Sequence, residues 1–277
     1  MQKKIHFISG LPRSGSTLLS GILRQNPLFH SAMSSPVASL MNGCLEQIGA
    51  GSEFFTFFDD EKRKNICHAL FDAYYQDRRQ QQVIFDTNRI WSARLHQLSE
   101  LFEGYKVICC VRNPAWIMDS FERIYRKNPF DYSRMFNIQT RQTVYSRCES
   151  MINAAGVVGS AWTALKEAYY GEDSARLLLV DYDLLAQYPQ RTLQLIYQFI
   201  DEPLYQHDFK NVDYQENDFD QKLGVKGLHT VKRQVEFKSR TTILPPDLFA
   251  KYSEMAFWED SVGTSASIIS PKKDAPA

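Results

Sequence analysis

The residues best suited to bind an anion lie near the start of the chain, in the segment Gly10-Leu11-Pro12-Arg13-Ser14-Gly15-Ser16-Thr17. This segment fits the pattern G-x-x-x-x-G-x-[ST], and it joins a short apolar run to a stretch with helical periodicity. The backbone amides from about Ser14 to Thr17 would point at one centre, and the positive end of the following helix would add to their field. We therefore expect a phosphate-binding loop, in which Arg13 is the cation. The alternative is a tight turn of Gly and Ser that binds nothing.

A second candidate for anion binding follows a later apolar run. Arg112 comes directly after that run, and Ser120 lies eight residues further on. Pro114 is well placed to open a helix that carries the serine. A guanidinium fork with a hydroxyl beside it suits a terminal phosphate. The alternative is that Arg112 forms an ordinary salt bridge with Glu122 or Asp119.

Four apolar runs, each ending in polar residues, predict the strands that position these groups: residues 5–8, 83–85, 107–111 and 177–180. Continuous rather than alternating apolar runs indicate strands covered on both faces. We expect an α/β fold, a P-loop-type parallel β-sheet flanked by helices on both faces, with ligands at the carboxyl ends of the strands. Residues 28–80 and 130–175 show helical spacing. Residues 1–262 are expected to form one domain, with a loop excursion at 205–240 and a disordered tail at 263–277.

The phosphate loop departs from that of the nucleoside triphosphatases, because Ser16 stands where those proteins have a lysine. Without that lysine the charge that holds the β- and γ-phosphates is missing. A P-loop nucleotide kinase or hydrolase is therefore a weaker hypothesis than an enzyme that uses another phosphate-bearing nucleotide. A non-catalytic nucleotide-binding protein is a further hypothesis.

Residues 12–17 resemble the 5′-phosphosulfate loop of the sulfotransferases, and Arg112 with Ser120 resembles the pair that holds the 3′-phosphate in that family. Residues 101–108 and 180–185 look like the corresponding stretches of bacterial sulfotransferases related to the tyrosylprotein sulfotransferases. Residues 226–232 match the region where the family closes a basic loop over the nucleotide. The resemblance implies 3′-phosphoadenosine 5′-phosphosulfate (PAPS) as the donor. It implies that the donor is bound by Arg13, Ser14, Gly15, Ser16, Thr17, Arg112, Ser120, Lys226, Gly227, Leu228 and His229.

The expected reaction is in-line displacement at sulfur by a hydroxyl acceptor, a peptide tyrosine, another phenol or another small molecule. Arg13 would stabilise the charge that develops on the leaving phosphate, and a general base would take the proton of the hydroxyl. The glutamate that the tyrosylprotein enzymes use has no counterpart in residues 30–36. Asp86, at the end of the second strand, is our candidate base, with helix capping or pairing with Arg89 as the alternative. His30 is the second candidate, and a lone histidine is more often structural.

Composition limits the partners of this 277-residue chain. Lys plus Arg and Asp plus Glu both number 32, so no broad charged surface for nucleic acid is expected. No apolar run reaches the roughly 20 residues of a membrane helix. Five cysteines without a C-x-x-C pair favour reduced thiols in the cytoplasm, and no metal-ligand spacing is present. A homo-oligomer is left open.

Overall fold

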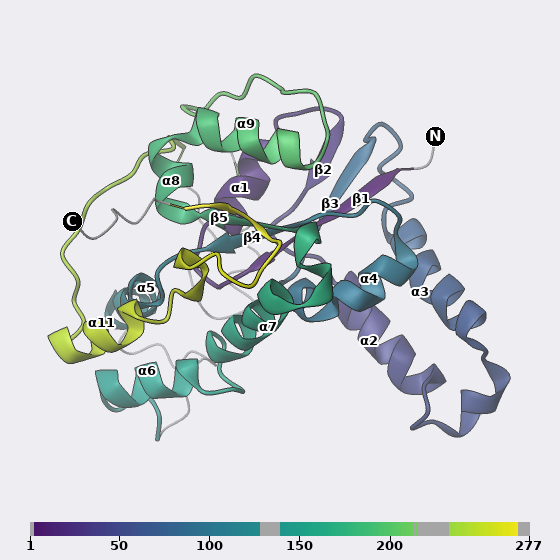
Figure 1. Cartoon of the computed structure of the whole chain (residues 1–277), viewed down its shortest axis with the longest axis horizontal. Coiled ribbons are helices and arrows are strands. Elements are labelled where there is room, and N and C mark those ends of the chain that lie inside the picture. The colour runs from purple at the N-terminus through teal and green to yellow at the C-terminus, as the bar shows by residue number, and fades with distance from the viewer. Residues whose placement is uncertain (1–2, 128–138, 213, 215–232, 271–277) are drawn as a thin grey trace.

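The computed structural model describes residues 3–127, 139–212, 214 and 233–270 (Figure 1). At its centre is a six-stranded sheet with the order β2-β3-β1-β4-β5-β6, in which every neighbouring pair is parallel. Strand β1, which leads into the phosphate loop, is therefore central. The strands are β1 Lys4–Gly10, β2 Phe29–Ser31, β3 Val83–Thr87, β4 Val107–Val111, β5 Leu177–Asp181 and β6 Ser267–Ile269.

Helices cover both faces of the sheet, as Figure 1 shows. Helices α1 (Ser16–Leu23), α8 (Tyr182–Gln187) and α9 (Pro189–Phe199) pack on one face. The helices of the other face and the rim are α2 Val37–Ile48, α3 Asp60–Tyr74, α4 Leu95–Leu101, α5 Pro114–Lys127, α6 Val144–Ile152, α7 Gly159–Tyr170 and α11 Pro246–Ser253. Short 3₁₀ helices are η1 Glu53–Phe57, η2 Arg89–Arg94, η3 Glu172–Arg176 and η4 Phe257–Glu259.

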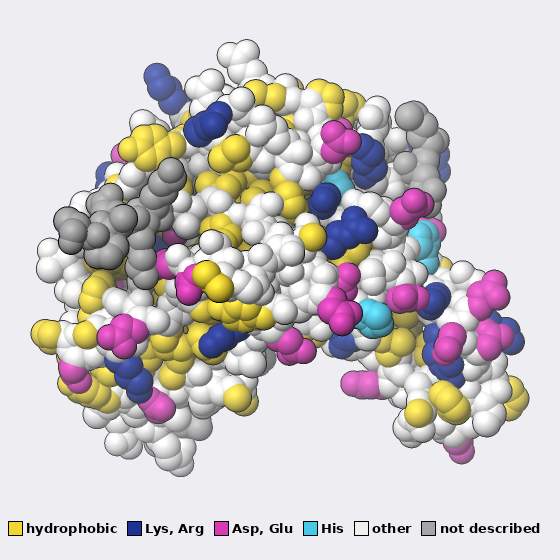
Figure 2. Space-filling model, viewed as in Figure 1, with side chains coloured by type: hydrophobic (Ala, Val, Ile, Leu, Met, Phe, Trp, Pro, Cys, Tyr) yellow, Lys and Arg dark blue, Asp and Glu magenta, His cyan; other side chains and the backbone are white. Residues whose placement is uncertain are grey.

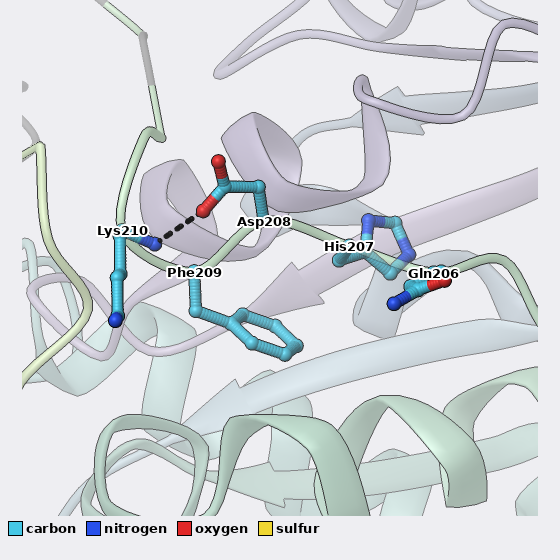
Figure 3. A pocket seen from close by; sticks show the side chains of 5 residues that line it. All are labelled: Gln206, His207, Asp208, Phe209 and Lys210. Carbon is cyan, nitrogen blue, oxygen red and sulfur yellow. Dashed lines mark hydrogen bonds between the residues drawn. The ribbon is translucent and has the colours of Figure 1, made fainter.

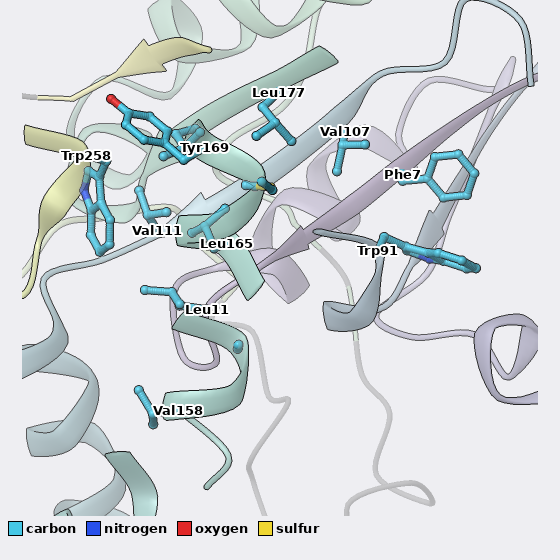
Figure 4. Close-up of a cluster of buried hydrophobic side chains, with 14 of the residues drawn as sticks. Phe7, Leu11, Trp91, Val107, Val111, Val158, Leu165, Tyr169, Leu177 and Trp258 are labelled. Atoms are coloured by element: carbon cyan, nitrogen blue, oxygen red, sulfur yellow. The ribbon is translucent and has the colours of Figure 1, made fainter. Parts of the chain in front are cut away.

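The continuous apolar runs exist because successive side chains of a strand enter two different cores. In β1, Phe7 belongs to the larger core and Ile8 to the core beneath α1, and in β4 Cys109 and Cys110 divide in the same way. Figure 4 shows the larger core, in which Phe7 lies near Trp91, with ring centroids 5.0 Å apart. Burying both faces leaves the strand ends as the place where the sheet can meet a ligand.

The expected α/β fold is confirmed, and all four predicted strands are present. Strands β2 and β6 were not predicted, since three-residue edge strands give almost no periodicity. The boundary drawn at residue 262 falls too early, because Ser267–Ile269 pairs with β5 and the side chain of Ile269 is buried. The expected tail from residue 271 onward lies outside the described residues.

Candidate active site at the carboxyl ends of the strands

The phosphate loop is a tight turn between β1 and α1 that needs unusual backbone angles. The φ angle is 106° at Gly10, 59° at Arg13 and 93° at Gly15, all in the left-handed region. A Cβ at Gly10 would lie 2.2 Å from the carbonyl oxygen of Cys110, so no side chain fits there. Glycine adopts such angles without a Cβ penalty, whereas a positive φ at a residue such as Arg13 is uncommon and often marks a functional site.

Ser14 holds the loop against the sheet. Its side chain is buried, and its hydroxyl lies within hydrogen-bonding distance of the carbonyl oxygens of Leu11 and of Cys110, at 2.7 Å from the latter. The predicted contact of Ser14 with a ligand is therefore left to its backbone. Ser16 and Thr17, the first residues of α1, are half-buried. The first amides of a helix have no acceptor within the helix, so this end of α1 can receive an anion.

A hydrogen bond joins the two predicted anion-binding motifs. The Nε of Arg13 donates to the Oγ of Ser120 over 3.2 Å, although the two residues are 107 positions apart in the sequence. Ser120 lies on α5, which begins at Pro114 as expected, and its side chain is buried. The phosphate loop and the N-terminal half of α5 are therefore parts of one site.

Arg112 directly follows β4, the strand that leads into α5. Its guanidinium carbon is 4.4 Å from the centroid of the Tyr182 ring, and its Nη2 is 3.5 Å from Oδ1 of Asp183. Only 12% of the Arg112 side chain is exposed. Tyr182 and Asp183 open α8, directly after β5, so β4 and β5 together place this guanidinium at the edge of the sheet.

The salt-bridge partners that the sequence offered for Arg112 are engaged elsewhere. Glu122 pairs with Arg147 at 2.7 Å and with Arg126 at 2.8 Å. Asp119 pairs with Arg123 at 2.8 Å and with Arg240 at 2.8 Å. Both carboxylates are buried, so their full neutralisation by these partners is required. The alternative that Arg112 pairs with Glu122 or Asp119 is therefore not what the structure shows, and its acidic neighbour is Asp183.

Arg240 is a cation of the site that sequence reasoning missed. Its guanidinium carbon is 5.4 Å from the Trp116 ring, one turn before Ser120, and its Nη2 pairs with Asp119. Burial lowers the pKa of Arg240, Asp119 raises it, and the nearby charges of Arg112 and Arg123 lower it again. Two guanidinium groups thus share the region beside α5. The only signal was the basic character of the chain before residue 240, which has no motif.

Two buried arginine nitrogens in this region can still donate a hydrogen bond. Among the described residues, none accepts a hydrogen bond from the Nε of Arg112 or from the Nε of Arg240. A buried donor without a partner costs about 1–3 kcal/mol. A phosphate has several acceptor oxygens and favours guanidinium forks. The arrangement therefore fits the terminal phosphate of a nucleotide.

Asp86, the predicted general base, lies at the centre of a buried hydrogen-bond cluster. Its Oδ2 accepts from the hydroxyls of Ser35 at 2.6 Å and Tyr75 at 2.8 Å, and its Oδ1 accepts from Nε1 of Trp91 at 2.8 Å. The side chain has no exposed surface, and burial raises its pKa. In this structure the carboxylate contacts neither solvent nor Arg89, so it holds three segments together where an acceptor does not reach it.

His30, the second candidate base, lies in β2 and packs against the ring of Tyr75, with centroids 5.4 Å apart. Burial lowers its pKa to about 4, and the positive charge of Arg78, followed by those of Arg24 and Lys3, also lowers it. Lys3 and Arg78 come before their strands and Arg24 follows α1. These groups mark the amino end of the sheet, whereas the phosphate loop lies at the carboxyl end. The structure therefore places His30 away from the loop.

The remaining predicted donor residues, Lys226, Gly227, Leu228 and His229, lie outside the described residues. A surface hollow of ≈ 510 Å³ is lined by the consecutive residues Gln206, His207, Asp208, Phe209 and Lys210 (Figure 3). It lies beside the far end of α1, because the side chain of Gln25 bonds to Asp208. The hollow is formed by a single segment and contains none of Arg13, Arg112 and Arg240.

Charges of both signs are interspersed over the face drawn in Figure 2, as the composition predicts. Within residues 3–127, 139–212, 214 and 233–270, no three His, Cys, Asp or Glu side chains are grouped so that they could hold a metal ion. In the same part of the chain, no helix has the length and apolarity needed to cross a membrane.

Comparison with known proteins assigns the family. A family model described as "Sulfotransferase family" matches residues 6–207. The sulfotransferase domain from the curacin biosynthetic pathway is 18% identical and has a TM-score of 0.53, with 92% of each chain covered. Mouse sulfotransferase SULT7A1, solved in complex with PAP, is 14% identical with a TM-score of 0.53, covering 95% of this chain and 88% of that one. No curated protein matches the sequence. At these identities the solved structures show a shared fold, and the family match, which spans most of the chain, shows that this protein is an enzyme of the sulfotransferase family.

Proposed function

We propose that this enzyme transfers a sulfuryl group from PAPS to a hydroxyl acceptor. The observation that carries the proposal is the 3.2 Å hydrogen bond from Nε of Arg13 to Oγ of Ser120. It brings a loop suited to one phosphate next to a helix and an arginine suited to a second. A nucleotide with phosphate groups at both its 5′ and 3′ positions needs two such sites, whereas a nucleoside triphosphate needs one extended site.

The side chains described above divide between these two sites. Arg13 and the first amides of α1 would hold the 5′ side of the nucleotide, and Arg112, Ser120 and Arg240 would hold its 3′-phosphate. When bound, the donor would supply an activated sulfuryl group. Fixed donors that face a developing negative charge are usually the largest contribution to catalysis. In this chain the helix amides and Arg13, which donates to Ser120, would act in that way on the departing 5′-phosphate.

On the acceptor side, we assign Asp86 a positioning role in place of the predicted role as general base. The acceptor class remains a hydroxyl compound, a peptide tyrosine or a small molecule. The cytoplasmic location stays a prediction, supported by five cysteines that are all free, four of them buried.

A P-loop kinase or hydrolase is the competing function, with Arg13 in place of the absent lysine. Thermal unfolding separates the two hypotheses, since a ligand at 100 times its Kd adds about 2.7 kcal/mol to the free energy of unfolding. We expect adenosine 3′,5′-bisphosphate to raise the Tm and magnesium-ATP to raise it far less. Arg112→Ala should lose the bisphosphate response, and Arg191→Ala, at an exposed position of α9, should keep it. The reverse preference for magnesium-ATP would refute the proposal.

Activity is tested by mass spectrometry. The protein is incubated with PAPS and a panel of tyrosine peptides, phenols and carbohydrates, and each acceptor is examined for an added sulfuryl group. Addition that depends on the wild-type protein, and that Arg13→Ala reduces by at least about tenfold, supports the proposal. Binding of the bisphosphate without transfer to any member of the panel would support a nucleotide-binding protein instead.

A further inference from the structure

Tyr182 contacts both anion-binding parts of the site, although neither motif includes it. It is the first residue of α8, directly after β5. On the loop side, its ring lies against the backbone of Gly15, because a Cβ there would be 2.7 Å from Cδ2 of Tyr182. On the α5 side, the guanidinium carbon of Arg112 is 4.4 Å from the centroid of the same ring. One aromatic ring thus lies between the phosphate loop and the arginine at the end of β4.

The backbone that carries this ring is firmly placed. The carboxylate of Asp181, at the end of β5, accepts hydrogen bonds from the backbone amides of Asp183 at 2.9 Å and Leu184 at 3.2 Å. Asp181 is buried, and β5 pairs with β4 so that Asp181 lies opposite Val111, the residue before Arg112. Tyr182 and Arg112 therefore leave neighbouring strands at the same level of the sheet.

Arg112 has few other contacts that could fix its direction. Its Nη2 lies 3.5 Å from Asp183, beyond a good charge-assisted hydrogen bond, and none of the described residues accepts from its Nε. A guanidinium that stacks on an aromatic face keeps the nitrogens at its edges available for hydrogen bonding. The ring of Tyr182 can therefore hold the plane of the guanidinium while leaving its donors for a phosphate.

We infer that Tyr182 is a positioning residue that couples the two anion sites, so that the enzyme selects a nucleotide with both phosphates over one with only the 5′-phosphate. The ring sets the separation of the phosphate loop from Arg112, and it acts through Arg112. The inference rests on the proposed function, because it assigns the 3′-phosphate to that arginine. The aromatic face, and not the phenolic hydroxyl, is the part that acts.

The test compares affinities measured by calorimetry for adenosine 3′,5′-bisphosphate and for 5′-AMP, which lacks the 3′-phosphate. For Tyr182→Leu we expect an approximately tenfold weaker binding of the bisphosphate, in line with the strength of a partly buried cation–π contact, and a smaller change for 5′-AMP. Tyr182→Phe should bind the bisphosphate like wild type. Tyr188→Leu, at a tyrosine that is 60% exposed, is the matched control and should change neither affinity.

A double-mutant cycle separates positioning from direct contact with the nucleotide. If Tyr182 acts through Arg112, Arg112→Ala combined with Tyr182→Leu should bind the bisphosphate as weakly as Arg112→Ala alone. Additive losses, an equal loss for 5′-AMP, or a Tyr182→Phe variant as weak as Tyr182→Leu would overturn the inference while leaving the proposed function intact. A folded wild type that does not bind the bisphosphate would overturn both.

Discussion

Asp86 is either the general base or a residue that holds its neighbours in position, and two substitutions distinguish these two roles. Asp86→Asn keeps the size of the side chain, and its oxygen can still accept from Nε1 of Trp91. The hydroxyls of Ser35 and Tyr75, which now donate to Oδ2, can rotate and accept from the new amide. Asp86→Ala removes the whole acceptor group.

The contacts give the expected magnitudes. In Asp86→Ala, the indole N–H cannot turn away, and a buried donor left without a partner costs about 1–3 kcal/mol. Each of the two hydroxyls loses a hydrogen bond worth about 1 kcal/mol. We expect the free energy of unfolding to fall by about 4 kcal/mol for alanine and by about 1 kcal/mol for asparagine, measured by urea titration at one pH.

The turnover rate, kcat, of Asp86→Asn decides between the two roles. If Asp86 only holds Ser35, Tyr75 and Trp91 together, Asp86→Asn should keep kcat within about tenfold of wild type, since a general base is worth about 10²–10⁴-fold. The assay is transfer to the best acceptor of the panel, with bisphosphate affinity measured on the same sample. A loss of kcat beyond about 100-fold, with the unfolding free energy and the bisphosphate affinity unchanged, would refute the positioning role and restore the carboxylate as the base.

Three further predictions concern acid stability, nucleotide binding and core packing. His6 is 3% exposed, and burial lowers its pKa to about 4 from 6.5. Because the folded state favours the neutral ring, the unfolded state binds a proton more readily between pH 6.5 and 4. The contribution of His6 to the unfolding free energy is therefore complete above pH 6.5 and falls as the pH drops from 6.5 toward 4. We expect His6 to account for a loss of about 2–3 kcal/mol of unfolding free energy between pH 7.5 and 4.5, and a His6→Gln variant with the same pH dependence would contradict this. Ser120→Ala should weaken binding of adenosine 3′,5′-bisphosphate by about 10- to 100-fold in calorimetry, and an unchanged affinity would show that the hydroxyl serves only the fold. Glu122→Gln breaks a buried pair with Arg147 and should cost about 3–5 kcal/mol in urea unfolding. Glu149 forms an exposed pair with Lys251 at 3.2 Å, and Glu149→Gln, as the matched variant, should cost less than about 1 kcal/mol; equal effects would refute the burial argument.

The sequence predicted the central strands and the glycine-containing turn after β1 because local rules determine them. A turn that excludes side chains at Gly10 needs glycine, and a buried parallel strand needs an unbroken apolar run, so both appear directly in the order of residues. The resemblance implied that Arg112 and Ser120 form one site with the loop, and the hydrogen bond from Arg13 to Ser120 is the contact that joins the loop to α5.

What the sequence did not predict depends on pairing between distant segments. Arg240 reaches the site only because its segment crosses α5, where the buried carboxylate of Asp119 also accepts from the amide of Ile243 at 2.8 Å. Asp86 was chosen for its place at a strand end, and nothing local indicated that Tyr75 and Trp91 would enclose it. Polar residues at strand ends identify the correct edge of the sheet, but burial decides which of them can meet a ligand.

The acids of the site explain how a chain with equal numbers of positive and negative residues presents a local positive field. Asp119 and Asp183 hold Arg240 and Arg112 at 2.8 Å and 3.5 Å, which keeps two like-charged guanidinium groups close together without a ligand. Asp119 also pairs with Arg123, and Arg13 donates to Ser120, so four arginines accompany these two carboxylates, and the buried Nε groups of Arg112 and Arg240 stay available. The carboxylates therefore reduce the cost of gathering the arginines without neutralising them fully, and the proposed 3′-phosphate would supply the charge and the acceptors that complete the arrangement.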